Sequence, residues 1–217
     1  MLTKTWSSAI QGVDAYTVEI EVNATGAGND DQVTVVGLPD TAVRESRERV
    51  WSAISCSGFF PPIGKTTVNL APADVRKEGA AFDLPIALGM IAAGNGFDRS
   101  ALKGAIIVGE LALDGSVRRI NGALPIALHA RLAGAHNLLV PAENAAEAAV
   151  IQGVNVFPIR HLLEAVHLFR GEDGPEPVQV RLQDIVREAH RDSADFAEVR
   201  GQEMAKRAME VAAASSI

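Results

Sequence analysis

The stretch that most constrains the fold runs from Ile106 to Gly134, where two short strands lead into a helix. The apolar and β-branched run of 106–113 predicts one strand, and 116–120 predicts a second. Asp114-Gly115 between them predicts a tight two-residue turn, because both residues tolerate the positive φ that hairpin turns need. Asn121 is a suitable N-cap for the helix that follows. We therefore expect a hairpin that leads into a helix packed against a sheet.

The hydrophobic pattern of the rest of the chain predicts further strands and helices, in an order typical of an α+β layer fold. Strands are expected over 4–11, 15–23, 32–37, 66–70, 137–140 and 154–157. Helices are expected over 40–56, 83–93, 142–150 and 160–169, with Asp40 and Asp83 as N-caps of the first two. In the first helix Arg44, Arg47 and Arg49 alternate with acidic residues, which indicates a solvated face or, alternatively, a contact with a polyanion.

Composition limits the class of protein. The 217 residues suffice for one large domain, or for one domain with an appendage, and the net charge of −7 argues against a strongly basic nucleic-acid module. Cys56 is the only cysteine, so no intrachain disulfide can form and a reducing, cytoplasmic setting is expected. No stretch has the run of apolar residues that a transmembrane helix needs, so we expect no membrane association. The five histidines show no ligand spacing, and we expect no metal site.

Gly64-Lys65-Thr66 looks like the end of a phosphate-binding P-loop. That motif needs a glycine at position 59, where Phe59 stands, and Gly58 is one position off. A P-loop must also follow a strand and open a helix, so that backbone N–H groups meet phosphate. Here a predicted helix precedes the motif and a predicted strand follows it. We therefore expect neither ATP nor another cofactor to bind this chain.

The predicted hairpin and helix, together with Lys77-Glu78-Gly79-Ala80-Ala81-Phe82-Asp83, resemble the proteolytic domain of Lon-type proteases. In that family a serine of the earlier segment is activated by a lysine at the start of the helix. Ala81 stands at the serine position and Leu124 at the lysine position, and shifting the alignment by one residue restores neither group. The resemblance implies an α+β fold of the ribosomal protein S5 domain 2-like type with a degenerate active site. It also implies that Ala81 and Leu124 lie close together, and we expect both to be buried or packed.

Composition changes after Arg170. We expect a first domain over 1–170 and a linker over 171–190, whose first residues are rich in Gly, Pro and acidic side chains. Residues 191–217 are similar to the opening segment of AAA+ ATPase modules, in which Val199, Gly201 and Gln202 would lie beside the nucleotide. The sequence contains no Walker motif, so the chain is expected to be a fragment that holds only the start of this module.

A degenerate Lon-like domain followed by an AAA+ module resembles the magnesium-chelatase-like ATPases, the group named after YifB and ComM. The resemblance implies a ring-forming, hexameric motor that uses ATP and Mg²⁺ in the intact protein. In ComM-type members the motor is a DNA helicase that drives branch migration during natural transformation. The first domain would be non-catalytic and would serve ring assembly, or would present DNA or a partner to the motor. Two alternatives stay open: a Lon-like serine peptidase with a misaligned site, and a stand-alone small-molecule site.

Four basic residues flank the degenerate dyad in the sequence and form a candidate site for single-stranded DNA. They are Arg76, Lys77, Arg118 and Arg119. The Lon resemblance brings the two segments together, so these charges would line one edge of the former active-site cleft. The alternative is that they pair with Glu78, Glu110 and Asp114 on the surface.

Overall fold

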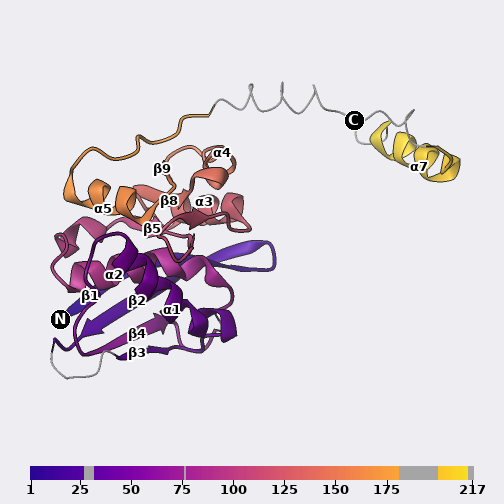
Figure 1. Cartoon of the computed structure of the whole chain (residues 1–217). Coiled ribbons are helices and arrows are strands. Elements are labelled where there is room, and N and C mark those ends of the chain that lie inside the picture. The colour runs from indigo at the N-terminus through magenta and orange to yellow at the C-terminus, as the bar shows by residue number, and fades with distance from the viewer. Residues whose placement is uncertain (27–31, 76, 181–199, 215–217) are drawn as a thin grey trace. The chain divides into compact units, whose positions relative to one another are not determined.

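A computed structural model describes residues 1–26, 32–75, 77–180 and 200–214 of the chain, which falls into two units, Met1–Gln179 and Val180–Ile217 (Figure 1). The described part of the second unit contains α7 (Glu203–Ala214), none of whose residues is buried. Gly201 and Gln202 precede this helix with φ of 72° and 61°, and the Lys206 N–H donates to the Gln202 carbonyl at 3.0 Å. Val199 lies outside the described residues.

The first unit is built from a mixed set of strands and helices. Its strands are β1 (Leu2–Gln11), β2 (Asp14–Ala24), β3 (Gln32–Val36), β4 (Lys65–Ala71), β5 (Ala105–Ile107), β6 (Glu110–Leu111), β7 (Val117–Arg118), β8 (Asn137–Pro141) and β9 (Asn155–Ile159). Its α-helices are α1 (Thr41–Cys56), α2 (Asp83–Ala93), α3 (Ala123–Leu132), α4 (Ala145–Ala148) and α5 (Leu162–Arg170). Three 3₁₀ turns accompany them, η1 (Ala80–Phe82), η2 (Arg99–Leu102) and η3 (Ala142–Asn144).

Seven of these strands form one sheet in the order β3-β4-β2-β1-β5-β8-β9. β2 is antiparallel to both β1 and β4, while the other neighbouring pairs are parallel. The antiparallel pairing of β1 with β2 follows from the tight hairpin at Gly12-Val13, whereas helical crossovers between β5, β8 and β9 make those strands parallel. The expected α+β fold class is confirmed, because the structure has a mixed, mostly parallel sheet covered by helices.

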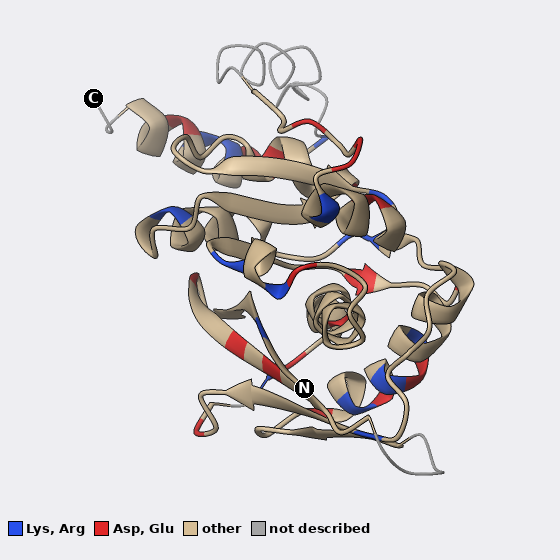
Figure 2. Cartoon of the chain, turned by 90° about the vertical axis from the view of Figure 1, so that its left-hand side faces the viewer, with Lys and Arg blue, Asp and Glu red and all other residues tan. Residues whose placement is uncertain are grey.

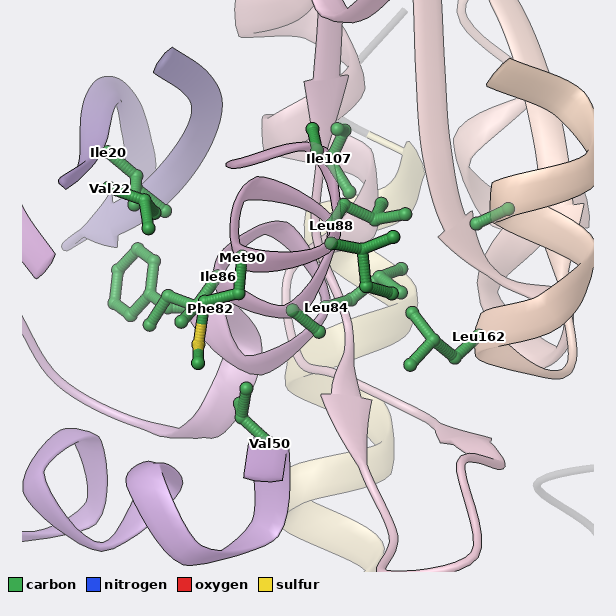
Figure 3. Close-up of a cluster of buried hydrophobic side chains, with 14 of the residues drawn as sticks. Ile20, Val22, Val50, Phe82, Leu84, Ile86, Leu88, Met90, Ile107 and Leu162 are labelled. Carbon is green, nitrogen blue, oxygen red and sulfur yellow. The ribbon is translucent and has the colours of Figure 1, made fainter. Parts of the chain in front are cut away.

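The core is organised around α2, every residue of which is buried. Figure 3 shows its side chains Leu84, Ile86, Leu88 and Met90 among residues from the sheet, α1 and α5. Burying one such aliphatic side chain contributes roughly 1.5–3 kcal/mol. The helix is apolar on all sides because neighbouring elements cover it all round. On the sheet, the alternating residues Val18, Ile20 and Val22 of β2 supply the facing layer.

The hairpin of β6 and β7 is shorter than its sequence pattern predicts. The Ala112 N–H donates to Ser116 O at 2.9 Å and the Gly115 N–H donates to Ala112 O at 3.0 Å. This hydrogen bonding closes a three-residue loop, with Gly115 at a φ of 91°, so the expected two-residue turn is wrong. The chain leaves the sheet after Val108, because the main chain of Gly109 bonds instead to Ala81 O and to the N–H of Leu84.

Two of the three expected helix caps are also wrong. Asp40 does cap α1, since it accepts from the Val43 N–H at 2.7 Å. Gly122, with a left-handed φ of 77°, takes the N-cap position of α3 in place of Asn121. Asp83 lies inside α2, where its carboxylate binds a side chain of α1 and not its own helix.

The first part of the expected linker, up to Gln179, belongs to the first unit. The Val178 N–H donates to the Val156 carbonyl of β9 at 2.8 Å, and Gly174 lies against the backbone of Leu168. This segment therefore partly covers the β9 edge of the sheet.

No helix in the described ranges is long and apolar enough to cross a membrane.

Candidate functional site

The candidate site lies where two central parallel strands diverge. β1 pairs with β5 at a single position, Trp6 with Ile106. Beyond it, β1 turns back to join β2 on one side, whereas the chain after β5 leads to β8 on the other. In open α/β sheets such a change of direction leaves a crevice outside the carboxyl ends of the strands, which is where ligands bind.

A cavity of about 420 Å³ occupies this crevice. Its walls come from Ser8–Ile10 of β1, from Glu78–Phe82, from Glu110 of β6 and from Arg119–Asn121. The two sequence segments that resemble the Lon motifs therefore meet at one place. The meeting is direct, because the Gly109 N–H donates to the Ala81 carbonyl at 2.9 Å.

The two dyad positions carry no nucleophile or base, and they differ in burial. Ala81 is partly buried in the cavity wall, whereas Leu124 is 41% exposed and its N–H donates to Glu147 Oε1. Both side chains are expected to be buried or packed, and Leu124 is not buried. Among the described residues that line the cavity, Ser8 carries a hydroxyl, and its Oγ donates to the Tyr16 carbonyl at 3.0 Å.

The four basic residues predicted for DNA are not equivalent in the structure. Lys77 is fully buried, its Nζ donates to the Val75 carbonyl at 2.7 Å, and desolvation lowers its pKa. Lys77 therefore adds no charge to an exposed basic cluster, and its prediction from sequence as a DNA-binding residue is wrong. Arg76 lies outside the described residues. Arg118 is exposed and pairs with Glu110 at 3.3 Å, while the exposed Arg119 borders the cavity.

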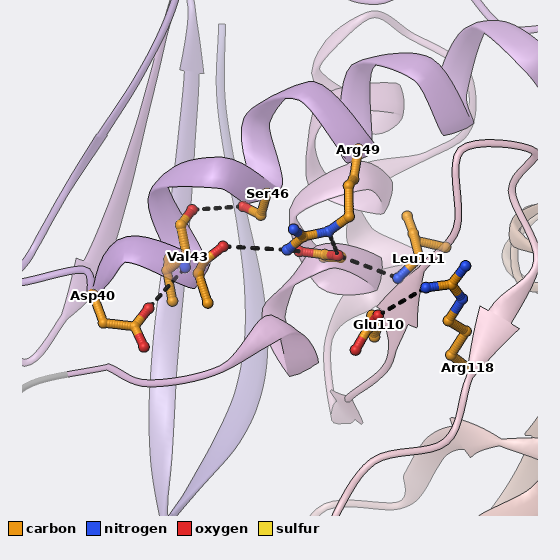
Figure 4. A network of polar contacts seen from close by, with 9 residues as sticks. Asp40, Val43, Ser46, Arg49, Glu110, Leu111 and Arg118 are labelled. Atoms are coloured by element: carbon orange, nitrogen blue, oxygen red, sulfur yellow. Dashed lines mark hydrogen bonds and ion pairs between the residues drawn. The ribbon is translucent and has the colours of Figure 1, made fainter.

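A buried ion pair holds the elements around the crevice together (Figure 4). Arg49 of α1 binds the carboxylate of Asp83, whose Oδ2 also accepts from the Leu111 N–H at 3.2 Å. Burial raises the pKa of Asp83 to about 6, although the neighbouring Arg49 opposes that shift.

The solvated face expected for α1 is confirmed at Arg47, which pairs with Glu48, but not at Arg49. Figure 2 shows the charged residues of both signs mixed along the chain.

Sequence reasoning missed two parts of this site. The β1 wall, Ser8–Ile10, was expected only as a strand. The pairing of Arg49 with Asp83 carries no local signal, because the residues are 34 positions apart.

Two further features of the sequence bear on ligand chemistry. Lys65 and Thr66 open strand β4, so the strand-to-helix context that a P-loop needs is missing. No group of three or more His, Cys, Asp or Glu side chains that could hold a metal ion occurs in the described part of the chain.

Comparison with known proteins shows the family. Residues 18–144 match the family model described as subunit ChlI of Mg-chelatase. The chain is 38% identical to competence protein ComM of Haemophilus influenzae over 210 residues, which cover 96% of this chain and 41% of that protein. It is 41% identical over 206 residues to the uncharacterized protein YifB of Salmonella typhimurium, covering 95% of this chain and 39% of that protein.

The chain therefore belongs to the magnesium-chelatase-like family that includes ComM and YifB. An uncharacterized protein of Mycobacterium tuberculosis, Rv2897c, is 36% identical over 215 residues, covering 99% of this chain and 42% of that protein. The chain spans between 39% and 42% of the length of these three relatives.

Proposed function

We propose that this chain is the non-catalytic N-terminal part of a ring-forming, ATP-driven motor that acts on DNA. The observation that carries the proposal is a crevice built from two Lon-like segments that has alanine and leucine at the dyad positions, in a chain of the ComM and YifB family. A domain of this kind would be of the S5 domain 2-like type. Its mixed sheet and the divergence of β1 from β5 support that finer assignment.

The nucleotide chemistry belongs to the intact protein. ATP and Mg²⁺ would bind in the module that α7 opens, with Gly201 and Gln202 beside the nucleotide. The backbone around these residues supports this, because their positive φ values create a sharp turn directly before the helix. The positive φ of Gln202 is uncommon for a residue with a side chain, so the backbone of this turn has an unusual conformation.

The DNA contact of the first unit, in this proposal, is made by Arg118 and Arg119. Both are exposed: Arg118 is the last residue of β7, and Arg119 directly after it lines the cavity. Because Arg118 already pairs with Glu110, binding to phosphate must compete with that carboxylate. We therefore propose a weak contact with single-stranded DNA that assists the motor and does not by itself hold the DNA.

The test uses the intact protein and a version without residues 1–170. Ring formation is measured by mass photometry with ATP and Mg²⁺, and branch migration is measured on a synthetic four-way DNA junction. We expect the intact protein to form hexameric rings and to migrate the junction only when ATP is hydrolysed. The shortened protein should retain ATP hydrolysis and lose part of its ring assembly or junction migration. An intact protein that hydrolyses no ATP, or leaves the junction unchanged, would overturn the proposal.

A Lon-like serine peptidase is the alternative, and the chemistry of the site does not favour it. Acyl transfer needs a nucleophile next to a base. Alanine and leucine at the two dyad positions supply neither group.

A further inference from the structure

The outer edge of strand β3 carries backbone groups with which no described strand pairs. β3 is the first strand in the order of the sheet, lies at its edge in Figure 1 and is parallel to β4. The Gln32 N–H donates to the carbonyl of Gly64, the residue before β4, at 3.4 Å. Because bonded positions alternate along a strand, Val33 and Val35 direct their N–H and C=O groups away from β4.

The sequence of β3 does not protect this edge against another strand. Proteins usually blunt a sheet edge with a charged residue, a proline or a bulge. β3 has the sequence Gln-Val-Thr-Val-Val, which contains no charged residue and no proline. Its β-branched residues are of the kind that favours strand pairing. The edge is therefore able to accept an additional strand.

The register of β3 makes the strand complementary to itself. When two β3 strands pair antiparallel about Thr34, Val33 of each copy lies opposite Val35 of the other. These residues have the outward-directed N–H and C=O groups, so each opposed pair exchanges both of its hydrogen bonds. Since Val33 and Val35 pack against the core, the Thr34 side chain lies on the other face of the sheet. There it meets the Thr34 of the second copy, and threonine opposite threonine stabilises a sheet.

The surroundings of the edge are complementary in the same arrangement. A cavity of about 400 Å³ lies between the start of β3 and α1, where Arg47, Glu48 and Trp51 line it. At the other end of β3, Val36 is 40% exposed and Leu38 beyond it is 54% exposed. Antiparallel pairing brings the end of one strand to the start of the other, so these apolar side chains come beside Trp51 of the second copy. Arg47 and Glu48 carry opposite charges, so the two copies do not meet with an excess of like charge.

We propose that the chain forms a two-fold dimer in which the β3 strands of two copies pair antiparallel and join their sheets. The partner is a second copy, because the register, the apolar end and the charges beside the edge match those of the same edge turned around. A two-fold contact joins chains in pairs, whereas a ring is closed by a repeating head-to-tail contact. The dimer is therefore a contact in addition to the ring proposed above, and it needs neither nucleotide nor DNA.

The first test places charges at the two-fold axis. The 217-residue chain, Thr34→Lys and Thr34→Glu are studied by sedimentation velocity at concentrations from micromolar upwards. The wild type should show a reversible rise from the mass of one chain to that of two. Each variant alone should raise the dissociation constant roughly tenfold or more, because like charges directly opposite on two strands repel. An equimolar mixture of the two variants should dimerise at least as well as the wild type, since lysine then faces glutamate.

Asn23→Lys is the matched control. Asn23 is exposed and lies in the same cross-strand row as Thr34, two strands further into the sheet. The added charge is therefore about 10 Å from Thr34 and further still from the second copy. At physiological salt it should change the dissociation constant less than about twofold. Thermal melts of all three variants show that they are folded.

The second test identifies the main-chain groups that pair. Hydrogen exchange is followed by NMR at low and high chain concentration. The Val33 and Val35 amides should become protected as the dimer forms, because their N–H groups then donate to the second copy. The Thr34 amide faces β4 in both states, and its exchange should depend on concentration much less.

Three results would overturn the proposal. The first is a chain that remains a monomer at every concentration. The second is a dimer that Thr34→Lys and Thr34→Glu leave unchanged. The third is failure of the equimolar mixture to dimerise, which would show that Thr34 does not face its counterpart across the axis. These measurements use neither ATP nor DNA, so their failure is distinct from failure of the ring and junction tests on the intact protein.

Discussion

Arg49 and Asp83 form a two-point ion pair across the interface between α1 and α2. Arg49 Nε donates to Asp83 Oδ2 at 2.8 Å and Nη2 donates to Oδ1 at 3.2 Å. The carboxylate is fully buried, and Leu111 of β6 donates its N–H to the same Oδ2. One side chain therefore joins α1, α2 and β6, and it fixes the Glu78–Phe82 wall of the crevice relative to Glu110.

Removing the arginine should destabilise the fold strongly. Arg49→Ala leaves the buried carboxylate of Asp83 without its cation, and losing one partner of a buried pair costs about 3 kcal/mol. The free energy of unfolding, measured in urea, should fall by that amount at neutral pH. Arg47→Ala removes an exposed ion pair with Glu48 and should change the free energy of unfolding by less than about 1 kcal/mol. Equal effects of the two substitutions would contradict the role assigned to Arg49.

Asp83 should make stability depend on pH in an unusual direction. Its pKa in the folded state is about 6, above the ordinary 3.8, because burial penalises the charged form more than Arg49 stabilises it. The folded state then binds the proton more tightly than the unfolded state does. The contribution of this group to stability is present at low pH and is lost as pH rises from about 4 to about 6.

This dependence can be measured by urea unfolding at several pH values for the wild type and for Asp83→Asn. Subtracting the two curves isolates the contribution of Asp83, and the carboxyl group can be titrated directly by NMR. A difference that grows in favour of the wild type over this pH range would show that the pKa is lowered and not raised.

The chain should cleave no protein. Incubation with unfolded casein should give no new bands on a gel, since Ala81 and Leu124 provide neither nucleophile nor base. Phenylmethylsulfonyl fluoride serves as a check on any cleavage that does appear. Cleavage that survives extensive purification and is lost on Ser8→Ala would show that the crevice contains an active peptidase site.

ATP should not bind to this chain with micromolar affinity. Lys65 and Thr66 are the first residues of strand β4, so Gly64-Lys65-Thr66 does not present backbone N–H groups at a helix N-terminus. Calorimetry with ATP and Mg²⁺ should detect no heat of binding for the wild type or for Lys65→Ala. Saturable binding that Lys65→Ala abolishes would make this segment a phosphate site after all.

Binding of single-stranded DNA should be weak and should depend on Arg118 and Arg119. The affinity should fall with salt at a log–log slope of roughly −0.7 for each phosphate contact. Replacing both residues by glutamate should abolish binding, whereas the matched reversal of Arg44 and Arg47 should leave it nearly unchanged. If the wild type shows no binding at low salt, or both double variants lose it equally, the first unit does not contact DNA through this strand.

The elements that could be predicted from sequence are those whose signal is local. The alternation of Val18, Ile20 and Val22 indicated β2, and Asp40 before an amphipathic run indicated the start of α1. The Lon-like segments indicated that the loop before α2 and the hairpin before α3 meet, and they do so at Ala81 and Gly109. Residue type alone also determined that the dyad positions hold no nucleophile or base.

Tertiary structure decided which side chains reach solvent and which strand edges are paired. Lys77 reads as a surface cation in sequence, yet its main chain pairs with Leu38 and Asp40 and its ammonium is buried. Asp83 reads as a helix cap, but a partner 34 residues away takes its carboxylate. Among the described strands, none pairs with the β5 side of β1 beyond Trp6, because the two strands diverge there. Burial and pairing depend on contacts between residues far apart in the chain, and local periodicity carries no record of those contacts.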